Sequence, residues 1–281
     1  MNALEIRGLM KRRGDFALQG LDLTLPAGCI MGLIGENGAG KSTTIRLILN
    51  ALSRDGGTVA VYGKDNRALT PLEWEDIGAV LDEVGLPEYM TARQIGRMMA
   101  GIFARWQPEV YRGYLRRLAL PEDKPFRDFS RGMKMKLGLA AALSHQPKLL
   151  LLDEATNGLD PVVRDEVTDI LLDFARDEEH SILISSHIVS DLEKLCDTIA
   201  FLHKGRLLLC EEKDALREEY ALWHGTAAQL AALDVRVYGK RVTPYGAEAL
   251  VRRDAMPAGA ELAPVSIEEL FVLMVKGECA E

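Results

Sequence analysis

Short apolar segments alternate with polar turns along most of the chain. Leu21, Leu23 and Leu25 alternate with polar residues, which is the period of a strand with one buried face. Residues 29–34 are almost wholly apolar and run into a glycine-rich loop, after which an apolar helix is predicted over 42–52. A continuous apolar run that ends at a turn is typical of a parallel strand covered on both faces. This part of the chain therefore favours an α/β core.

The same alternation continues after a helical middle section. Residues 86–143 have a helical pattern, and strands are predicted at 149–152 and 181–184 with a helix at 161–175 between them. Alternating strands and helices indicate a mainly parallel sheet. Within the middle section, an apolar set recurs at helix spacing and is expected to face the core. Its members are Ile95, Met99, Ile102, Phe103 and Trp106.

The pattern weakens after about residue 216. We therefore expect one large domain over 1–216, with a helical subdomain at about 86–143, and a small C-terminal accessory region over 217–281. Apolar residues at helix spacing over 265–274 predict a terminal helix docked by packing, although a dimer-stabilising segment would also fit.

Composition narrows the class of protein. The formal net charge is −8, whereas nucleic-acid binders usually carry basic faces, so no nucleic-acid partner is expected. No run of 18 apolar residues occurs and the first residues have no apolar leader core, which predicts a cytoplasmic protein. The cysteines lack metal-ligand or redox spacing and are expected to be small apolar residues in a reducing compartment. They are Cys29, Cys196, Cys210 and Cys279.

The glycine-rich loop carries the first chemical motif. It reads Gly35-Glu36-Asn37-Gly38-Ala39-Gly40-Lys41-Ser42 and satisfies the phosphate-loop pattern between a strand and a helix. Glycines let backbone N–H groups converge on phosphate oxygens, and the helix start adds partial positive charge. We expect Lys41 to reach the β- and γ-phosphates and the Ser42 hydroxyl to bind Mg²⁺. The alternative, a turn with an incidental lysine, is disfavoured by the flanking elements.

Two carboxylates and a histidine follow later strands. Asp153 and Glu154 come directly after the strand at 149–152, at the edge where α/β sheets bind ligands. Asp153 is expected to hold Mg²⁺ through water, and Glu154 to polarise the water that attacks the γ-phosphate. A solvated turn or helix cap is the alternative. His187 follows the strand at 182–185 and is placed to contact the γ-phosphate.

These motifs occur in an order that resembles ABC transporter nucleotide-binding domains. After the phosphate loop come Phe129-Ser130-Arg131-Gly132-Met133, Asp153-Glu154, Gly158-Leu159-Asp160 and Ser185-Ser186-His187. The resemblance covers roughly residues 2–215 and is strongest to bacterial export-type cassettes of the YtrB-like branch.

The resemblance implies the fold and the activity. It implies an α/β P-loop NTPase of ABC type, with a mixed, mainly parallel sheet core, an antiparallel β edge, a helical subdomain and a C-terminal appendage. It also implies an ATPase that uses ATP and Mg²⁺ to power a separately encoded integral membrane permease, at the inner face of the cell membrane. The helical region 86–143 would then carry the permease-contacting face.

The resemblance further implies a dimer. Two cassettes, identical or different, would close head-to-tail around two ATP molecules. Ser130 and Gly132 of the signature motif would contact the γ-phosphate held by the opposite cassette, and Asp160 would lie in a loop that communicates across the dimer. In its own cassette, the nucleotide-binding set would extend to Thr43.

The sequence departs from the family pattern at several positions. Arg131 and Met133 stand where the family often has Gly and Gln. Asp82 stands where the family usually has a metal-contacting glutamine, unless a shifted alignment gives this role to Glu83. The common proline after the Glu154 position is an alanine, which should have a mild effect.

A further departure concerns the residue that stacks on the adenine of ATP. Arg13 stands where the family usually has an aromatic residue that stacks on adenine. A guanidinium plane can also stack, and Phe16 is the alternative. Neither this nor the other departures removes the lysine, the metal-binding acid, the general base or the histidine.

Other ATPase classes fit less well. A soluble ABC ATPase acting on ribosomes or another cytosolic partner normally has two cassettes in one chain, and only one phosphate loop occurs here. A chromosome-maintenance ATPase would need a long coiled coil between the motifs, and no sustained heptads occur there. A small GTPase would need a guanine-reading Asn-Lys-x-Asp motif, which is absent. The resemblance implies export of a cargo that the permease chooses.

Overall fold

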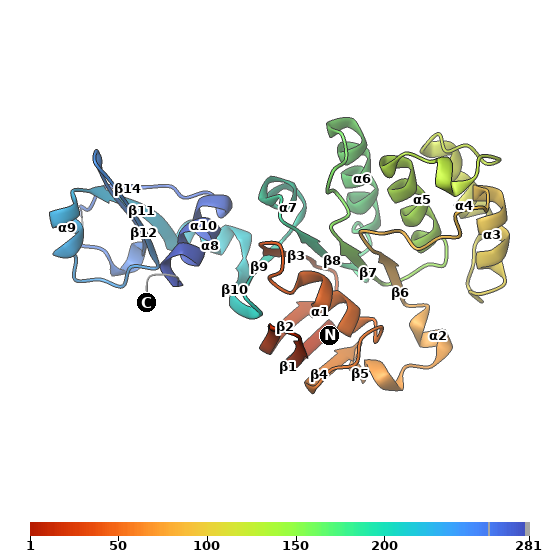
Figure 1. Ribbon diagram of the computed structural model, residues 1–281, viewed down its shortest axis with the longest axis horizontal. Helices are drawn as coiled ribbons and strands as arrows, with labels where there is room; N and C mark the ends of the chain where they lie inside the picture. The colour runs from red at the N-terminus through yellow and green to blue at the C-terminus, as the bar shows by residue number, and fades with distance from the viewer. Residues whose placement is uncertain (258, 279–281) are drawn as a thin grey trace.

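A central mixed sheet organises the chain in the computed structural model, which describes residues 1–257 and 259–278 (Figure 1). Its strand order is β10-β9-β3-β8-β7-β6. Neighbouring strands run parallel except β10, which pairs antiparallel with β9. The strands are β3 (Ile30–Gly35), β6 (Ile77–Val80), β7 (Leu149–Asp153), β8 (Ser181–Ser186), β9 (Thr198–His203) and β10 (Arg206–Glu212). The predicted mainly parallel core is confirmed.

An antiparallel sheet lies beside this core and supplies the predicted β edge. Its order is β2-β1-β4-β5. Its strands are β1 (Asn2–Arg13), β2 (Phe16–Pro26), β4 (Gly56–Val61) and β5 (Lys64–Asp65). The β1–β2 hairpin turns through Gly14 and Asp15, and Gly14 takes a positive φ of 59°. Two-residue hairpin turns favour such a residue.

The two faces of the central sheet bury two separate cores. Successive strand residues point to opposite faces, so Leu149 and Leu151 pack with the antiparallel sheet and helix α1 (Lys41–Ile48). Leu150 and Leu152 pack instead with the helices of the other face. All four leucines are fully buried. This two-sided burial explains why the strands are continuously apolar.

Helices cover the second face and extend into the helical subdomain. They are α3 (Ala92–Ala100), α4 (Pro108–Arg117), α5 (Arg131–Leu143), α6 (Pro161–Phe174) and α7 (Val189–Leu195). The short helix α2 (Pro71–Trp74) belongs to the other side, where Trp74 packs against the core shared with the antiparallel sheet. Short 3₁₀ turns lie at η1 (Asn66–Ala68) and η2 (Phe126–Asp128). The helical character predicted for 86–143 is thus present as separate helices.

One residue of the predicted apolar stripe was placed wrongly. Helix α3 ends at Ala100, and Pro108 begins a new helix, so the spacing does not continue through the loop between them. Ile102 is consequently 63% exposed. Trp106 is buried, and Phe103 stacks on His145 with ring centroids 4.2 Å apart, so these two residues reach the core from the loop.

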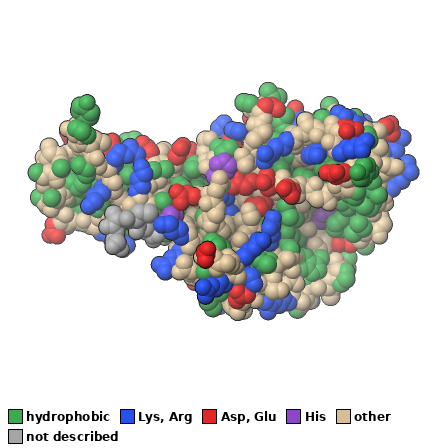
Figure 2. Space-filling model, viewed as in Figure 1, with side chains coloured by type: hydrophobic (Ala, Val, Ile, Leu, Met, Phe, Trp, Pro, Cys, Tyr) green, Lys and Arg blue, Asp and Glu red, His purple; other side chains and the backbone are tan. Residues whose placement is uncertain are grey.

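A third sheet forms beyond the cassette, at one end of the elongated molecule (Figures 1 and 2). Its order is β12-β13-β11-β14. The elements of this end are α8 (Lys213–Glu219), β11 (Tyr220–Gly225), α9 (Ala227–Ala231), β12 (Gly239–Thr243), β13 (Gly246–Arg252), η3 (Arg253–Ala255), β14 (Leu262–Ala263) and α10 (Ile267–Glu278).

Helix α10, the predicted terminal helix, joins this end to the cassette. Its Phe271 packs edge-on against Phe201 of the central sheet, with ring centroids 5.1 Å apart. At Gly239 of β12 an added Cβ would lie 2.0 Å from the Leu273 carbonyl oxygen, so only glycine permits this approach of strand and helix. The docking is therefore a matter of packing on both sides of α10.

Two further sequence expectations concern membrane-spanning segments and the cysteines. Within the described residues, no helix has both the length and the apolar character that a membrane span requires. Cys29, Cys196 and Cys210 are free thiols, and Cys196 is buried. Cys279 lies outside the described residues.

Candidate functional site

The phosphate-binding loop leaves β3 at Gly35 and enters α1 at Lys41, as the motif predicts. Gly38 and Gly40 both take positive φ values, 83° and 116°. At Gly40 an added Cβ would lie 2.8 Å from Cζ of Phe16, so a side chain there would be both strained and crowded. The loop conformation therefore depends on its glycines.

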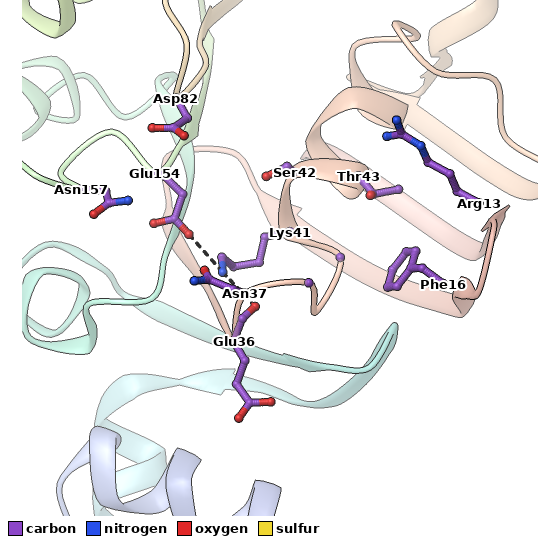
Figure 3. Close-up of a pocket in the computed structure, with 12 residues that line it drawn as sticks. Arg13, Phe16, Glu36, Asn37, Lys41, Ser42, Thr43, Asp82, Glu154 and Asn157 are labelled. Carbon is purple, nitrogen blue, oxygen red and sulfur yellow. Dashed lines mark hydrogen bonds and ion pairs between the residues drawn. The ribbon is translucent and has the colours of Figure 1, made fainter. Parts of the chain in front are cut away.

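Lys41 is 5% exposed and its ammonium group has a full set of acceptors. Nζ donates to the Gly35 carbonyl oxygen at 2.7 Å and to the Glu36 carbonyl oxygen at 3.2 Å. It also lies 3.0 Å from Oε1 of Glu154 (Figure 3). An ammonium offers three donors, so the buried charge is paired and hydrogen-bonded, as burial requires.

Asp153 is the last residue of strand β7 and accepts hydrogen bonds from two hydroxyl groups. Ser42 Oγ donates to its Oδ1 at 3.0 Å, and Ser185 Oγ donates to the same oxygen at 2.7 Å. Parallel strands β7 and β8 place Asp153 beside Ser185 in register. The predicted partners Ser42 and Asp153 are therefore in direct contact, and Ser185 is a site residue to which sequence reasoning gave no role.

Glu154 follows in a strained backbone conformation. Its φ is +53°, which is unusual for a residue with a side chain. Its backbone N–H lies 3.1 Å from both the carbonyl oxygen and Oγ of Ser185. His187 Nδ1 lies 2.7 Å from Glu154 Oε2. The carboxylate is thus held between Lys41 and His187, so these three predicted residues form one bonded set.

A cavity of about 510 Å³ opens beside Lys41 and Glu154 (Figure 3), and Asp153 and His187 are not among the residues that line it. The loop residues that line it are Glu36, Asn37, Gly38, Gly40, Lys41, Ser42 and Thr43. Gly35 and Ala39 shape the loop without lining the cavity. The residues from other segments that line it are Arg13, Phe16, Asp82, Glu154 and Asn157.

The lining residues bear on two choices left by the sequence: Arg13 or Phe16 for adenine stacking, and Asp82 or Glu83 for contact with the metal. Arg13 and Phe16 flank the same side of the cavity, since they pair at the tip of the β1–β2 hairpin. Asp82 and Asn157 lie on the opposite side, and Glu83 is not among the lining residues. Asn157 was missed by sequence reasoning. The one available signal was its position three residues after Glu154, whose carbonyl oxygen accepts its N–H at 3.0 Å.

The signature residues lie outside this cavity. Ser130 caps helix α5, and its Oγ accepts the N–H of Met133 at 3.3 Å. Arg131 is the first residue of α5 and forms an ion pair with Asp82, with Nη2 and Oδ1 2.7 Å apart. The signature residues Ser130, Arg131, Gly132 and Met133 do not line the cavity. The structure therefore does not bring the signature motif onto the nucleotide pocket of its own chain.

Asp160 is likewise outside the cavity. It caps helix α6, and its Oδ1 accepts the N–H groups of Val162 and Val163 at 3.1 and 3.0 Å. The helix begins with Pro161 directly after it. In the isolated chain this residue has a local, helix-capping contact.

The site chemistry fits a magnesium ion shared with a nucleotide. Ser42 and Asp153 offer one hydroxyl and one carboxylate, and Asp82 adds a carboxylate to the cavity wall. Among residues 1–257 and 259–278, no group of three or more His, Cys, Asp or Glu side chains is arranged to bind a metal by itself. Mg²⁺ typically takes only one or two carboxylates and completes its shell with water and phosphate oxygens.

Comparison with known proteins identifies relatives of the chain. Residues 18–157 match the family described as ABC transporter. The ABC transporter ATP-binding protein YtrB of Bacillus subtilis (strain 168) is 33% identical over 218 residues, which are 77% of this chain and 74% of YtrB. The Nod factor export ATP-binding protein I of Rhizobium sp. (strain N33) is 33% identical over 301 aligned positions, covering 98% of both chains. A solved structure described as an ATP-binding subunit of an ABC transporter is 27% identical, with a TM-score of 0.69 over 76% of this chain and 92% of its own.

Proposed function

The chain belongs to the ABC transporter family and is an ATP-binding cassette that hydrolyses ATP, and we propose that it drives a separately encoded integral membrane permease. The observation that carries the hydrolytic activity is the bonded set of Lys41, Glu154 and His187 beside Asp153 at the strand ends. Carboxylates at the ends of parallel strands, facing a phosphate loop, are the arrangement that nucleotide hydrolysis requires. The permease is supported by relatives described as transport ATP-binding proteins.

We propose that hydrolysis proceeds by an exchange of partners in this set. The Lys41 ammonium leaves the Glu154 carboxylate and binds the β- and γ-phosphate oxygens of ATP, because the triphosphate carries more negative charge than one carboxylate. The freed Glu154 carboxylate then accepts a proton from the water that attacks the γ-phosphorus, as the bond to the bridging oxygen of ADP breaks. His187 keeps Glu154 oriented and contacts the γ-phosphate. Ser42 and Asp153 would hold Mg²⁺, which supplies charge neutralisation at the phosphates.

The adenine is expected to lie against the β1–β2 hairpin. Arg13 and Phe16 line the same wall of the cavity, so either a guanidinium plane or a phenyl ring is available for stacking. Phe16 also packs against Gly40 of the loop, where an added Cβ would lie 2.8 Å from its ring. The nearby atom is Cζ, at the tip of the ring. We assign Arg13 as the stacking group, with Phe16 as the alternative.

The position of the signature motif supports the proposal of a dimer. Ser130 and Arg131 are exposed at the start of α5, outside the pocket of their own chain. A helix start with a hydroxyl and free N–H groups suits an anion. We propose that it meets the γ-phosphate held by a second cassette, with Gly132 allowing close approach, and that Asp160 lies at the same dimer interface.

The permease is proposed to dock on an apolar groove beside β6. The groove has a volume of about 340 Å³, and its lining includes Val84, Leu86, Met99, Phe103 and His145. It lies between the central sheet and the helical subdomain, so a segment bound there would sense movement between them. Docking would place the chain at the inner face of the cell membrane.

The direction of transport is proposed to be export. Relatives of this chain are described as a Nod factor export protein and as bacitracin and lantibiotic transport proteins, each an ATP-binding component. These names support export of a cargo that the permease selects.

The proposal is tested by purifying the tagged chain from gently solubilised membranes of its native host. We expect a multi-span membrane protein to co-purify and to alter the ATPase rate. Leu86→Asp should lose this partner, because it places a charge in the apolar groove. Leu72→Asp is the matched control, since Leu72 is 59% exposed and outside the groove. Recovery of ribosomes or other soluble partners alone would refute the permease proposal and leave the ATPase intact.

A further inference from the structure

Two departures from the family pattern contact each other in this chain. Asp82 and Arg131 stand where the family pattern given above usually has a glutamine and often has a glycine. The two new charges have opposite signs, and Arg131 Nη2 lies 2.7 Å from Asp82 Oδ1. Both side chains are about half exposed, at 50% and 48%. Two unusual residues 49 positions apart thus form one charge-assisted hydrogen bond.

The ion pair connects two functional segments. Asp82 follows β6 and lines the nucleotide cavity together with Lys41 and Ser42. Arg131 begins α5 and follows directly on the capping residue Ser130. The pair therefore joins the wall of the nucleotide cavity to the start of the signature helix.

Arg131 also touches the segment that leads to Asp160. At Gly158, which has a φ of 66°, an added Cβ would lie 2.9 Å from Arg131 Nη1 and 3.2 Å from its Cζ. A side chain at this point would require the guanidinium to shift. The guanidinium is thus seated between the Asp82 loop and the Gly158 turn.

We propose that the Asp82–Arg131 ion pair is a latch that holds the start of the signature helix against the nucleotide cavity and is released when a magnesium nucleotide binds. This inference rests on the proposed binding of Mg²⁺ with ATP in that cavity. Among the described residues, Arg131 is the one ion-pair partner of Asp82. A half-exposed pair is weak and exchanges readily, whereas a carboxylate oxygen is a preferred ligand of Mg²⁺. Asp82 therefore exchanges Arg131 for the ion, and Arg131 becomes a positioning residue that is free to turn toward the second cassette.

The latch predicts an effect of unexpected sign. Removal of a positive charge near an anionic nucleotide ordinarily weakens binding, because the attraction between them is lost. If the latch must open, however, loss of Arg131 leaves Asp82 already free, and binding with Mg²⁺ becomes tighter. By linkage, the gain equals the cost of opening the pair. The gain vanishes when Asp82 is removed as well.

The test measures binding of the non-hydrolysable analogue AMP-PNP to the full chain by calorimetry. Titrations are run with excess Mg²⁺ and with EDTA, at chain concentrations where light scattering shows a monomer. We expect Arg131→Gln to bind about two- to fivefold more tightly than the unsubstituted chain with Mg²⁺, and no more tightly with EDTA. Asp82→Asn should bind more weakly with Mg²⁺, and adding Arg131→Gln to it should give no gain.

Arg127→Gln is the matched control. Arg127 is 53% exposed, lies four residues before Arg131 and pairs with Asp128 at 3.6 Å, so its loss removes the same charge without opening the latch. It should bind no more tightly than the unsubstituted chain. Weaker or unchanged binding by Arg131→Gln with Mg²⁺, or an equal gain in the Asp82→Asn background, overturns the latch.

The permease proposal and the latch can fail separately. Binding to the monomer requires neither a permease nor a second cassette, so absence of a membrane partner leaves the titrations interpretable. Lys41→Ala verifies that the analogue occupies the cavity, because it should lose binding in both conditions.

Discussion

The catalytic set and the signature motif of this chain differ in how far the chain itself organises them. Lys41, Asp153 and Glu154 are each less than 9% exposed and are bonded to one another or to their neighbours. Ser130 and Arg131 are exposed, and their contacts are a helix cap and a solvent-facing ion pair. Buried polar groups must be paired within the fold, whereas exposed ones can wait for a partner. The first region is therefore ready for a nucleotide, and the second is ready for another molecule.

The largest expected effect is the loss of ATPase activity when the buried catalytic set is disrupted. Lys41→Ala removes the cation that compensates the β- and γ-phosphates and leaves the buried Glu154 carboxylate with His187 as its remaining side-chain partner. We expect ATPase activity to fall by about a hundredfold or more. Steady-state phosphate release measures this, with Lys64→Ala as the control because Lys64 is on the surface and pairs with Glu73. Normal turnover in Lys41→Ala would remove the loop from the mechanism.

Glu154→Gln should separate binding from hydrolysis. The amide keeps the shape of the side chain but cannot accept the proton of the attacking water. Turnover should fall by about a hundred- to ten-thousandfold, while nucleotide binding by calorimetry remains. A variant with unchanged turnover would place the general base elsewhere.

A smaller effect should distinguish the signature motif from an ordinary helix start. Ser130 caps α5 and Thr91 caps α3, each hydroxyl accepting the N–H three residues later, and Gln94 adds a reciprocal bond to Thr91. Ser130→Ala and Thr91→Ala should each lose about 1 kcal/mol of stability, seen as similar falls in Tm. Ser130→Ala alone should also lose about tenfold in ATPase rate at limiting ATP, through the hydrogen bond to a charged phosphate. Equal rates for the two variants would reduce Ser130 to a cap.

The smallest effect is a pH dependence in the proposed permease groove. Burial lowers the pKa of the His145 imidazole below its ordinary value of about 6.5. The unfolded chain therefore binds a proton that the folded chain resists, so this residue's contribution to stability is complete above about pH 6.5 and is lost as the pH falls below it. When the pH is lowered from 7.5 to 5.5, the Tm of the His145→Gln variant should fall by less than the Tm of the unsubstituted chain. His224→Gln, at a half-exposed side chain, should behave like the unsubstituted chain.

The same contrast explains what could be predicted from sequence. The phosphate loop is one contiguous motif, and Asp153 and Glu154 are fixed by the register of buried strands, so spacing determines where they lie. The bond between Asp82 and Arg131 joins residues 49 positions apart and depends on how α5 packs beside β6. No local pattern encodes that distance.

The C-terminal sheet was beyond prediction for a different reason. Most of its strands are as long as those of the central sheet, but their burial does not follow a sustained two-residue period. In β12 only Gly239 is buried, and in β13 Ala249, Leu250 and Val251 are buried in succession. Helix α10 is longer, and its apolar spacing was recognised. Ile102 shows the opposite failure, since its spacing was helical but the helix had already ended at Ala100.

The most direct test of the contrast is the mass of the Glu154→Gln chain in solution, measured by light scattering during size-exclusion chromatography. We expect a monomer without nucleotide and a dimer with ATP and Mg²⁺, because bound ATP gives the exposed signature helix of one chain a phosphate to meet on the other. Adding Ser130→Ala should weaken that dimer. A monomer under both conditions, at chain concentrations where ATP binding is saturated, would contradict the account of two regions that complete each other.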